Sequence, residues 1–145
     1  MEAAVPLPHK VLQYESFVND VLRQDLKKVH MRRDRLLSEL AEYIQLKNVL
    51  ETVVELKLDN GFKTKLNLGC DFYVQANIRD ASKVFLDVGL GYHVEFTLAE
   101  ALVFIEKRIN LLTQQTASLR KDSAKTKAMI KLVLGGLSEL QKNVN

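Results

Sequence analysis

The chain has 145 residues, which is enough for one domain, and 47% of them are hydrophobic and 27% charged. This composition excludes a disordered chain, and no apolar run approaches the roughly 20 residues of a membrane-spanning helix. The net charge of +3 is too small to indicate nucleic-acid binding, and the opening MEAAVPLPHK lacks the basic and apolar regions of a secretory signal.

A long helix is predicted over about residues 9–58, after a flexible tail of residues 1–8. Its heptad seam is apolar at eight of eleven positions, and the stripe continues upstream through Val11, Tyr14 and Val18 at a slipped spacing. That slip indicates local unwinding of a supercoil. At the other end, Asp59-Asn60-Gly61 are residues that end a helix or start a turn. The seam positions are Leu22, Leu26, Val29, Arg33, Leu36, Leu40, Tyr43, Lys47, Leu50, Val54 and Lys57.

A second helix is predicted over about residues 97–142, where ten of thirteen seam positions are apolar. Thr97 and Glu100 form a capping box at its start, and Gly135-Gly136 predict fraying near its end. Two helices this long predict an antiparallel coiled coil with both ends of the chain at one end of the coil. The seam positions are Leu98, Leu102, Ile105, Ile109, Leu112, Thr116, Leu119, Ser123, Thr126, Ile130, Val133, Leu137 and Leu140.

Residues 62–96 alternate apolar and polar side chains, which predicts four short strands, each with one apolar face. Turn residues separate them at Gly69-Cys70, Asp80-Ala81-Ser82 and Gly89-Leu90-Gly91. The helices are expected to run away from this sheet, so its apolar face has no cover within the chain and is predicted to join subunits. The assembly residues are Phe62, Leu66, Leu68, Phe72, Val74, Val84, Leu86, Val88, Tyr92, Val94 and Phe96.

The predicted fold class is therefore α+β: a long antiparallel two-helix coiled coil with two β-hairpins at the joined end, forming a single domain over residues 9–145. At the opposite end, apolar residues beside the seams exceed what two paired helices can bury. They predict a surface that binds clients or partners, with ordinary fraying, or packing of that end on itself, as the alternative. These tip residues are Leu12, Phe17, Val21, Leu132 and Leu134.

The stretch VFLDVGLGYHVEFTLAEALVFIEKRI, residues 84–109, resembles the strand–glycine turn–strand–helix signature of prefoldin alpha-type subunits. LGCDFYV at residues 68–74 and YIQLKNVLE at residues 43–51 are most similar to the unconventional, prefoldin-like branch of that family. The resemblance covers nearly the whole chain after Pro8. It implies a non-enzymatic subunit of a hetero-oligomer with beta-type and alpha-type chains, joined through their sheets, whose coiled coils bind client proteins.

The same resemblance implies partners in RNA polymerase assembly and among nuclear receptors, and a location in cytoplasm, nucleus and centrosome. It leaves open a second role, that of a transcription coregulator or adaptor acting in the nucleus through coiled-coil contacts. From the residues themselves, neither a membrane nor direct contact with nucleic acid is expected.

The candidate chemical groups are few. The chain has a single cysteine, Cys70, which favours a reducing compartment. A catalytic thiol needs a nearby base, and His93 is the only candidate in the strand region, so Cys70 is interpreted as a turn residue. His9, His30 and His93 lack metal-ligand spacing, and Gly89-Leu90-Gly91 joins two strands where a nucleotide fingerprint opens a helix. The sequence therefore predicts no catalytic, cofactor or metal site.

The most basic run, KKVHMRRDR, has three interpretations: a solvated helix face, a nuclear import or partner patch, and a DNA-contacting region. Two observations argue against DNA contact. The heptads begin at Leu22, before the run, whereas a DNA-contacting basic region should precede them, and Arg33 falls on the seam itself. Tyr43, also on the seam, is interpreted as packing. The cations of this run are Lys27, Lys28, Arg32, Arg33 and Arg35.

Overall fold

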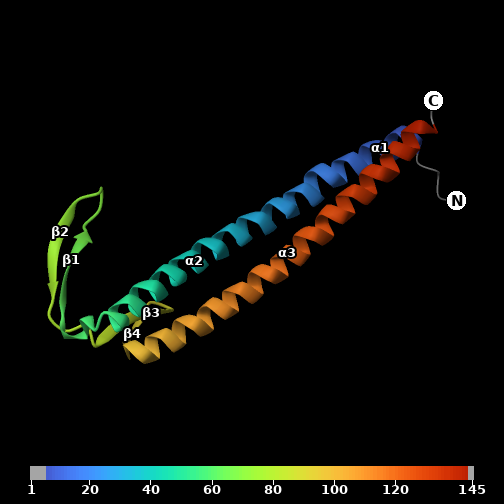
Figure 1. Ribbon diagram of the computed structural model, residues 1–145. Helices are drawn as coiled ribbons and strands as arrows, with labels where there is room; N and C mark the ends of the chain where they lie inside the picture. The colour runs from blue at the N-terminus through green and yellow to red at the C-terminus, as the bar shows by residue number, and fades with distance from the viewer. Residues whose placement is uncertain (1–5, 144–145) are drawn as a thin grey trace. The chain divides into compact units, whose positions relative to one another are not determined.

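The computed structural model describes residues 6–143, so five residues of the predicted tail lie outside the described part. Figure 1 shows long helices and two β-hairpins in the predicted order, with the first helix starting two residues earlier than expected. No helix within the described residues is long and apolar enough to cross a membrane. The elements are α1 (Leu7–Ser16), the π-helix η1 (Phe17–Leu22), α2 (Arg23–Glu55), the 3₁₀ turn η2 (Leu58–Asn60), β1 (Phe62–Asn67), β2 (Tyr73–Ile78), β3 (Lys83–Gly89), β4 (Tyr92–Thr97) and α3 (Leu98–Lys142).

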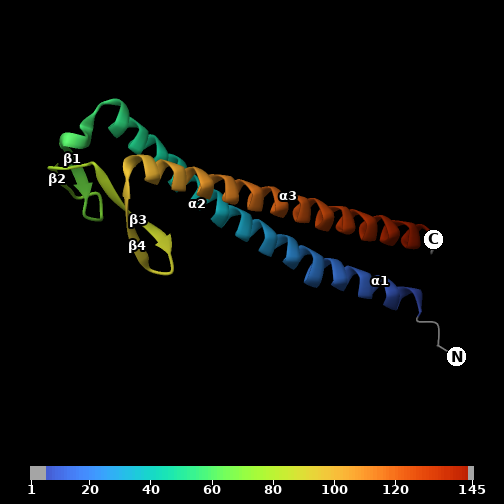
Figure 2. The ribbon, with the colours of Figure 1, turned by 90° about the horizontal axis from the view of Figure 1, so that it is seen from below.

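The chain divides into two compact units, and α2 and α3 each contribute residues to both. The first unit consists of residues 1–38 and 112–145, and the second of residues 39–111. In the first unit the two helical segments lie side by side and run in opposite directions, as Figures 1 and 2 both show. His30 of α2 and Ser123 of α3 form a hydrogen bond of 3.1 Å there, which fixes the register of the two segments.

The predicted seams account for most of the burial along both helices, although Ala101, which is fully buried near the start of α3, lies off the predicted seam. All thirteen positions on α3 are buried or partly buried, and α3 continues through Gly135 and Gly136 to Lys142 without a break. On α2 the predicted positions are buried or partly buried as far as Leu50. The next predicted seam position, Val54, is wrong, because Val54 is exposed and its neighbour Val53 is buried instead. The helix ends directly after this change of face, at Glu55.

The slipped spacing in the first helix coincides with the π-helix. Val18 and Leu22 are buried, and Leu26 is the next partly buried residue, so two steps of four follow one another where a heptad alternates four and three. This extra residue is absorbed by wider turns, since the Arg23 N–H donates to the Val18 carbonyl five residues earlier. The predicted local unwinding is thus a π-helical insertion.

The core of the second unit forms where the hairpin of β3 and β4 meets helical residues of α2 and α3. Leu50, Leu86, Ala101 and Ile105 make up its fully buried cluster. Ile105 has no exposed surface at all. Partly buried side chains surround this cluster: Tyr43, Leu46, Val84, Phe96, Leu98, Leu102, Phe104 and Ile109.

Each hairpin is an antiparallel two-stranded sheet whose register agrees with the predicted alternation. Phe62 pairs with Ile78 at one end of β1 and β2, and Val84 pairs with Phe96 in β3 and β4. Even-numbered residues therefore share one face of each hairpin. The register of the second hairpin shifts by one residue between Asp87 and Gly89, at the predicted glycine turn.

Gly61 makes the exit from the first helix possible. Its φ of 111° lies in the region that favours glycine, and a Cβ there would stand 2.6 Å from the carbonyl oxygen of Ile78 and 2.7 Å from that of Arg79. The backbone of residues 78–79 therefore occupies the space that a side chain would need. The start of β1 and the end of β2 can approach each other so closely only because residue 61 is glycine.

Candidate functional site

The hairpin of β1 and β2 carries an exposed apolar surface on its even-numbered face. Leu66, Leu68 and Phe72 are 52%, 59% and 62% exposed, while Phe62 and Val74 are partly buried. The Leu68 N–H donates to the Phe72 carbonyl at 2.8 Å, which extends the ladder into the turn and holds these two side chains in place. We call Leu66, Leu68 and Phe72 the hairpin patch.

The even-numbered face of β3 and β4 differs, and here the expectation of an uncovered face is wrong. Leu86 is only 7% exposed, because it packs with Leu50, Ala101 and Ile105 in the core of the second unit. Val84 and Phe96 pack against the same cluster. The remaining assembly residues of this hairpin are Val88, which is partly buried, and Tyr92 and Val94, which are exposed.

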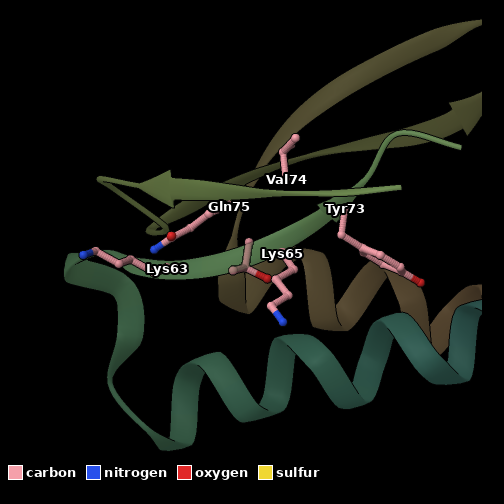
Figure 3. Close-up of a pocket in the computed structure, with 6 residues that line it drawn as sticks. Lys63, Lys65, Tyr73, Val74 and Gln75 are labelled. Atoms are coloured by element: carbon pink, nitrogen blue, oxygen red, sulfur yellow. The ribbon is translucent and has the colours of Figure 1, made fainter. Parts of the chain in front are cut away.

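The odd-numbered face of β1 and β2 is polar and hollowed. Figure 3 shows Lys65 and Tyr73 on one side of the hairpin and Val74 on the other, as the alternation requires. A cavity of about 520 Å³ lies along these strands, lined mainly by Lys63, Lys65, Tyr73 and Gln75. The two faces of this hairpin therefore offer a partner different chemistry, apolar on one side and basic on the other.

Both hairpins have open edges. Among the described residues, β1 pairs only with β2, and β3 pairs only with β4. The outer edge of every strand therefore presents backbone N–H and C=O groups that can pair with a strand of another chain. Phe85 and Leu90 add exposed apolar surface to the second hairpin outside the predicted assembly set. Leu90 could have been recognised from the sequence as an apolar residue between two turn glycines.

The tip residues all lie in the first unit and are exposed to solvent. Leu132 is 77% exposed and Leu12 64%, and Phe17, Val21 and Leu134 are each exposed by about two fifths. A nearby cavity of about 340 Å³ is lined by α1 and the last turns of α3, including Tyr14, Val133, Gly136, Leu137 and Leu140. Apolar surface thus remains uncovered where α1 runs beside the end of α3.

An ion pair in the second unit was not expected from the sequence. Arg108 of α3 donates to Glu39 of α2 at 3.2 Å, and its guanidinium carbon lies 5.9 Å from the centre of the Tyr43 ring. Partial burial acts to lower the pKa of Arg108, but the hydrogen bond to Glu39 and the interactions with Tyr43 together outweigh it, so the pKa lies above its ordinary value. Tyr43 therefore has a partner beyond the predicted seam packing, and the group joins the two helices in this unit.

The candidate chemical residues are not brought together. Cys70 is exposed in the turn of the first hairpin at a φ of 50°, His93 lies on β4, and His30 bonds to Ser123 in the first unit. No group of three or more His, Cys, Asp or Glu residues that could hold a metal ion occurs within the described part of the chain.

The basic run of the sequence lies on α2 in the first unit. Lys27, Lys28, Arg32 and Arg35 are exposed, whereas Arg33 is partly buried, as its seam position predicts. Lys28 pairs with Asp25 and Arg33 with Asp34, at 3.7 and 2.9 Å. These pairs neutralise only part of the run.

Known proteins resemble this chain over most of its length. Residues 22–143 match the family described as Prefoldin subunit. Protein UXT from Homo sapiens is 46% identical over 132 residues, covering 91% of this chain and 83% of that protein. Protein UXT homolog from Nematostella vectensis is 44% identical over 133 residues, covering 91% and 84%.

The fold is also found among solved structures. The chain matches the cryo-EM structure of filamentous PFD from Methanocaldococcus jannaschii with a TM-score of 0.65 at 22% identity, covering 81% of this chain and 98% of that one. This similarity confirms the predicted prefoldin-like fold, with long helical segments and two antiparallel β-hairpins.

Proposed function

This chain belongs to the prefoldin family, and we propose that it is a subunit of a hetero-oligomeric prefoldin-like co-chaperone complex that binds client proteins through the tips of its helices. Members of this family are non-enzymatic scaffold and chaperone subunits and assemble with other prefoldin subunits. The residues that carry these roles here are inferred from the exposed surfaces.

The hairpin patch is the observation that carries the assembly role. Three large apolar side chains, Leu66, Leu68 and Phe72, are exposed on a two-stranded sheet with open edges. An isolated two-stranded hairpin is marginally stable in water and gains stability when further strands or apolar surface cover it. The hairpins of partner subunits, of beta-type and alpha-type, supply both the further strands and the apolar surface. In this assembly we expect the polar face around Lys63 and Lys65, both exposed in the isolated chain, to stay toward solvent.

Isolation of the tagged chain from cells under native conditions, followed by mass spectrometry of the intact complex, tests this function. We expect other prefoldin or prefoldin-like subunits in fixed stoichiometry. Isolation of the chain without any such subunit would contradict the proposal. Recovery with transcription factors alone would support the second role, that of a coregulator or adaptor.

The tip residues are proposed to bind clients. Apolar side chains on two neighbouring helical segments can repack around different partners, which suits weak contact with many unfolded sequences. Phe17 and Leu134 come from different segments of the first unit, and both are exposed, so substitution should not disturb the buried seam.

We expect the double variant Phe17→Ser and Leu134→Ser to keep the parent's oligomer size and to hold a chemically unfolded client about tenfold more weakly, because the apolar contact area is lost. Light scattering and suppression of client aggregation measure the two properties. A matched control, Met31→Ser with Met129→Ser, removes two exposed apolar side chains of the same unit that are not tip residues. If both variants lost client binding equally, or if the Phe17 and Leu134 variant lost none, the proposal of a client site at the tips would be contradicted.

We further propose that the complex acts in both cytoplasm and nucleus, with factors that assemble RNA polymerases and with nuclear receptors among its partners. The exposed basic residues Lys27, Lys28, Arg32 and Arg35 support nuclear import. Imaging of the tagged chain with and without these cations tests this location, which includes the centrosome. A nuclear fraction unchanged by their removal would exclude the run as an import signal.

A further inference from the structure

The charges of the chain divide unequally between its two units. Residues 1–38 and 112–145 hold 13 of the 21 Lys and Arg residues but only 7 of the 18 Asp and Glu residues. The first unit therefore has a formal charge of +6, and residues 39–111 have −3. Excess charge of one sign opposes a compact state through self-repulsion, so the excess of cations lowers the stability of the first unit.

The spacing of five of these cations places them on one flank of the first unit. On α2, Lys27 and Arg23 lie three and seven residues before His30. On α3, Arg120 lies three residues before Ser123, and Lys127 and Lys131 lie four and eight residues after it. Such spacings place residues on one face of a helix. The hydrogen bond between His30 and Ser123 joins the two faces, so the rows lie side by side. This basic stripe comprises Arg23, Lys27, Arg120, Lys127 and Lys131.

The chain itself does not neutralise the basic stripe. All five cations are exposed, and no ion pair to any of them occurs among residues 6–143. Asp34, four residues after His30 on the same face, receives both of its hydrogen bonds from Arg33, at 2.9 and 3.2 Å. Within the stripe, Lys127 and Lys131 are like charges one turn apart, a spacing that weakens a helix. An anionic partner would remove this repulsion.

One end of the basic stripe reaches a hollow that is partly apolar. Arg23 lines a cavity of about 360 Å³ whose wall includes the apolar residues Val18, Leu134 and Leu137 and also the polar residues Glu15, Asn19, Ser138 and Gln141. A ligand that follows the stripe therefore meets cations first and then a mixed hollow, where an apolar side chain can contact Val18, Leu134 and Leu137. This order of chemistry is typical of a polypeptide ligand, since one chain can carry carboxylates and an apolar side chain in sequence.

We propose that the basic stripe is a docking site for an acidic segment of a partner protein, with its carboxylates along the stripe and an adjacent apolar side chain in the hollow. From Arg120 to Lys131 the helix rises about 17 Å, the length of about five extended residues or three turns of helix. The stripe has no aromatic side chain on which bases could stack, so an acidic peptide suits it better than a single-stranded nucleic acid. This surface adds a charge-based contact to the apolar client binding proposed above.

The test uses the full chain and a fluorescent glutamate-rich peptide containing leucine, with binding followed by anisotropy. We expect binding of this peptide, weakening as salt rises from about 50 to about 300 mM, and no binding of its glutamine counterpart. The variant Lys27→Gln, Arg120→Gln, Lys127→Gln should bind the peptide about tenfold more weakly, because it loses three exposed ion pairs.

A matched control removes the same charge from other faces of the same unit. Arg35, Lys121 and Lys125 are exposed, and the two lysines lie two residues before and after Ser123, away from its face. Their triple Gln variant should bind the peptide within about twofold of the parent. Equal loss in both variants would show attraction to net charge alone and would overturn the proposal. Tighter binding of a single-stranded RNA of equal charge through the same five cations would overturn it in favour of nucleic acid.

Discussion

Substitution of Leu66 and Phe72 by aspartate is expected to abolish assembly with prefoldin subunits while leaving the helices folded. Both side chains are more than half exposed in the chain alone, so the change costs little within the subunit. In the assembled state, each would place a charge in an apolar contact without a partner. We expect affinity for partner subunits to fall by at least about a hundredfold. Native mass spectrometry of co-expressed subunits measures assembly, and circular dichroism measures helix content.

The opposite face of the same hairpin provides the control. Asn67→Asp with Gln75→Asp adds the same two charges on the odd-numbered side, and Asp at 67 keeps an acceptor for the Gly69 N–H, which lies 2.8 Å from Asn67 Oδ1. We expect this variant to assemble like the parent chain. The reverse pattern, with assembly lost only in the control, would place the partner against the basic face around Lys63 and Lys65.

Leu86→Asp is expected to have the largest effect on stability, lowering the free energy of unfolding by about 4 kcal/mol or more. Leu86 is buried with Leu50, Ala101 and Ile105, and none of these neighbours can pair with a carboxylate. The loss of apolar burial and the desolvation of the charge act in the same direction. Chemical denaturation followed by circular dichroism measures the change, and loss of assembly should follow from unfolding of the second unit.

Phe85→Asp is the control for this prediction. Phe85 is the preceding residue of the same strand, but it points to the other face and is 69% exposed. Its substitution should change the free energy of unfolding by about 1 kcal/mol or less. If Leu86→Asp proved equally mild, the packing of β3 and β4 against the helices would not be the core of this unit.

The helices could be predicted in detail because a helix that pairs along its length repeats one environment every three or four residues. Every seam position that this repeat predicted on α3 is buried or partly buried, including the polar residues Thr116, Ser123 and Thr126. The repeat did not indicate Ala101, which is fully buried in the core of the second unit. The prediction stopped holding where the pairing changed. At the end of α2 the buried residue is Val53, one position before the one that the heptad assigns.

The hairpins show what alternation in a sequence cannot reveal. It indicates which residues share a face, and the observed register agrees with it in both hairpins up to the shift between Asp87 and Gly89. It does not indicate what covers that face, because Leu66 and Leu86 occupy equivalent places in the pattern. Leu66 is exposed, whereas Leu86 is buried because it packs on the helical residues Leu50, Ala101 and Ile105 of its own unit. The pair of Arg108 and Glu39 was missed for a similar reason, since it joins residues 69 positions apart.

The π-helix at Phe17–Leu22 has a consequence for how the start of this chain is oriented. In an unbroken α-helix, one additional residue would turn everything before it by about 100°. The wider turns of the π-helix take up this rotation, so Leu12 and Tyr14 keep nearly the faces that they would have without the additional residue. Deletion of one residue between Phe17 and Leu22, with a return to α-helical turns, would therefore leave α1 and the pairing from Leu26 onward facing as they do now. At this point the helix can thus gain or lose one residue while the surface at its start keeps its direction.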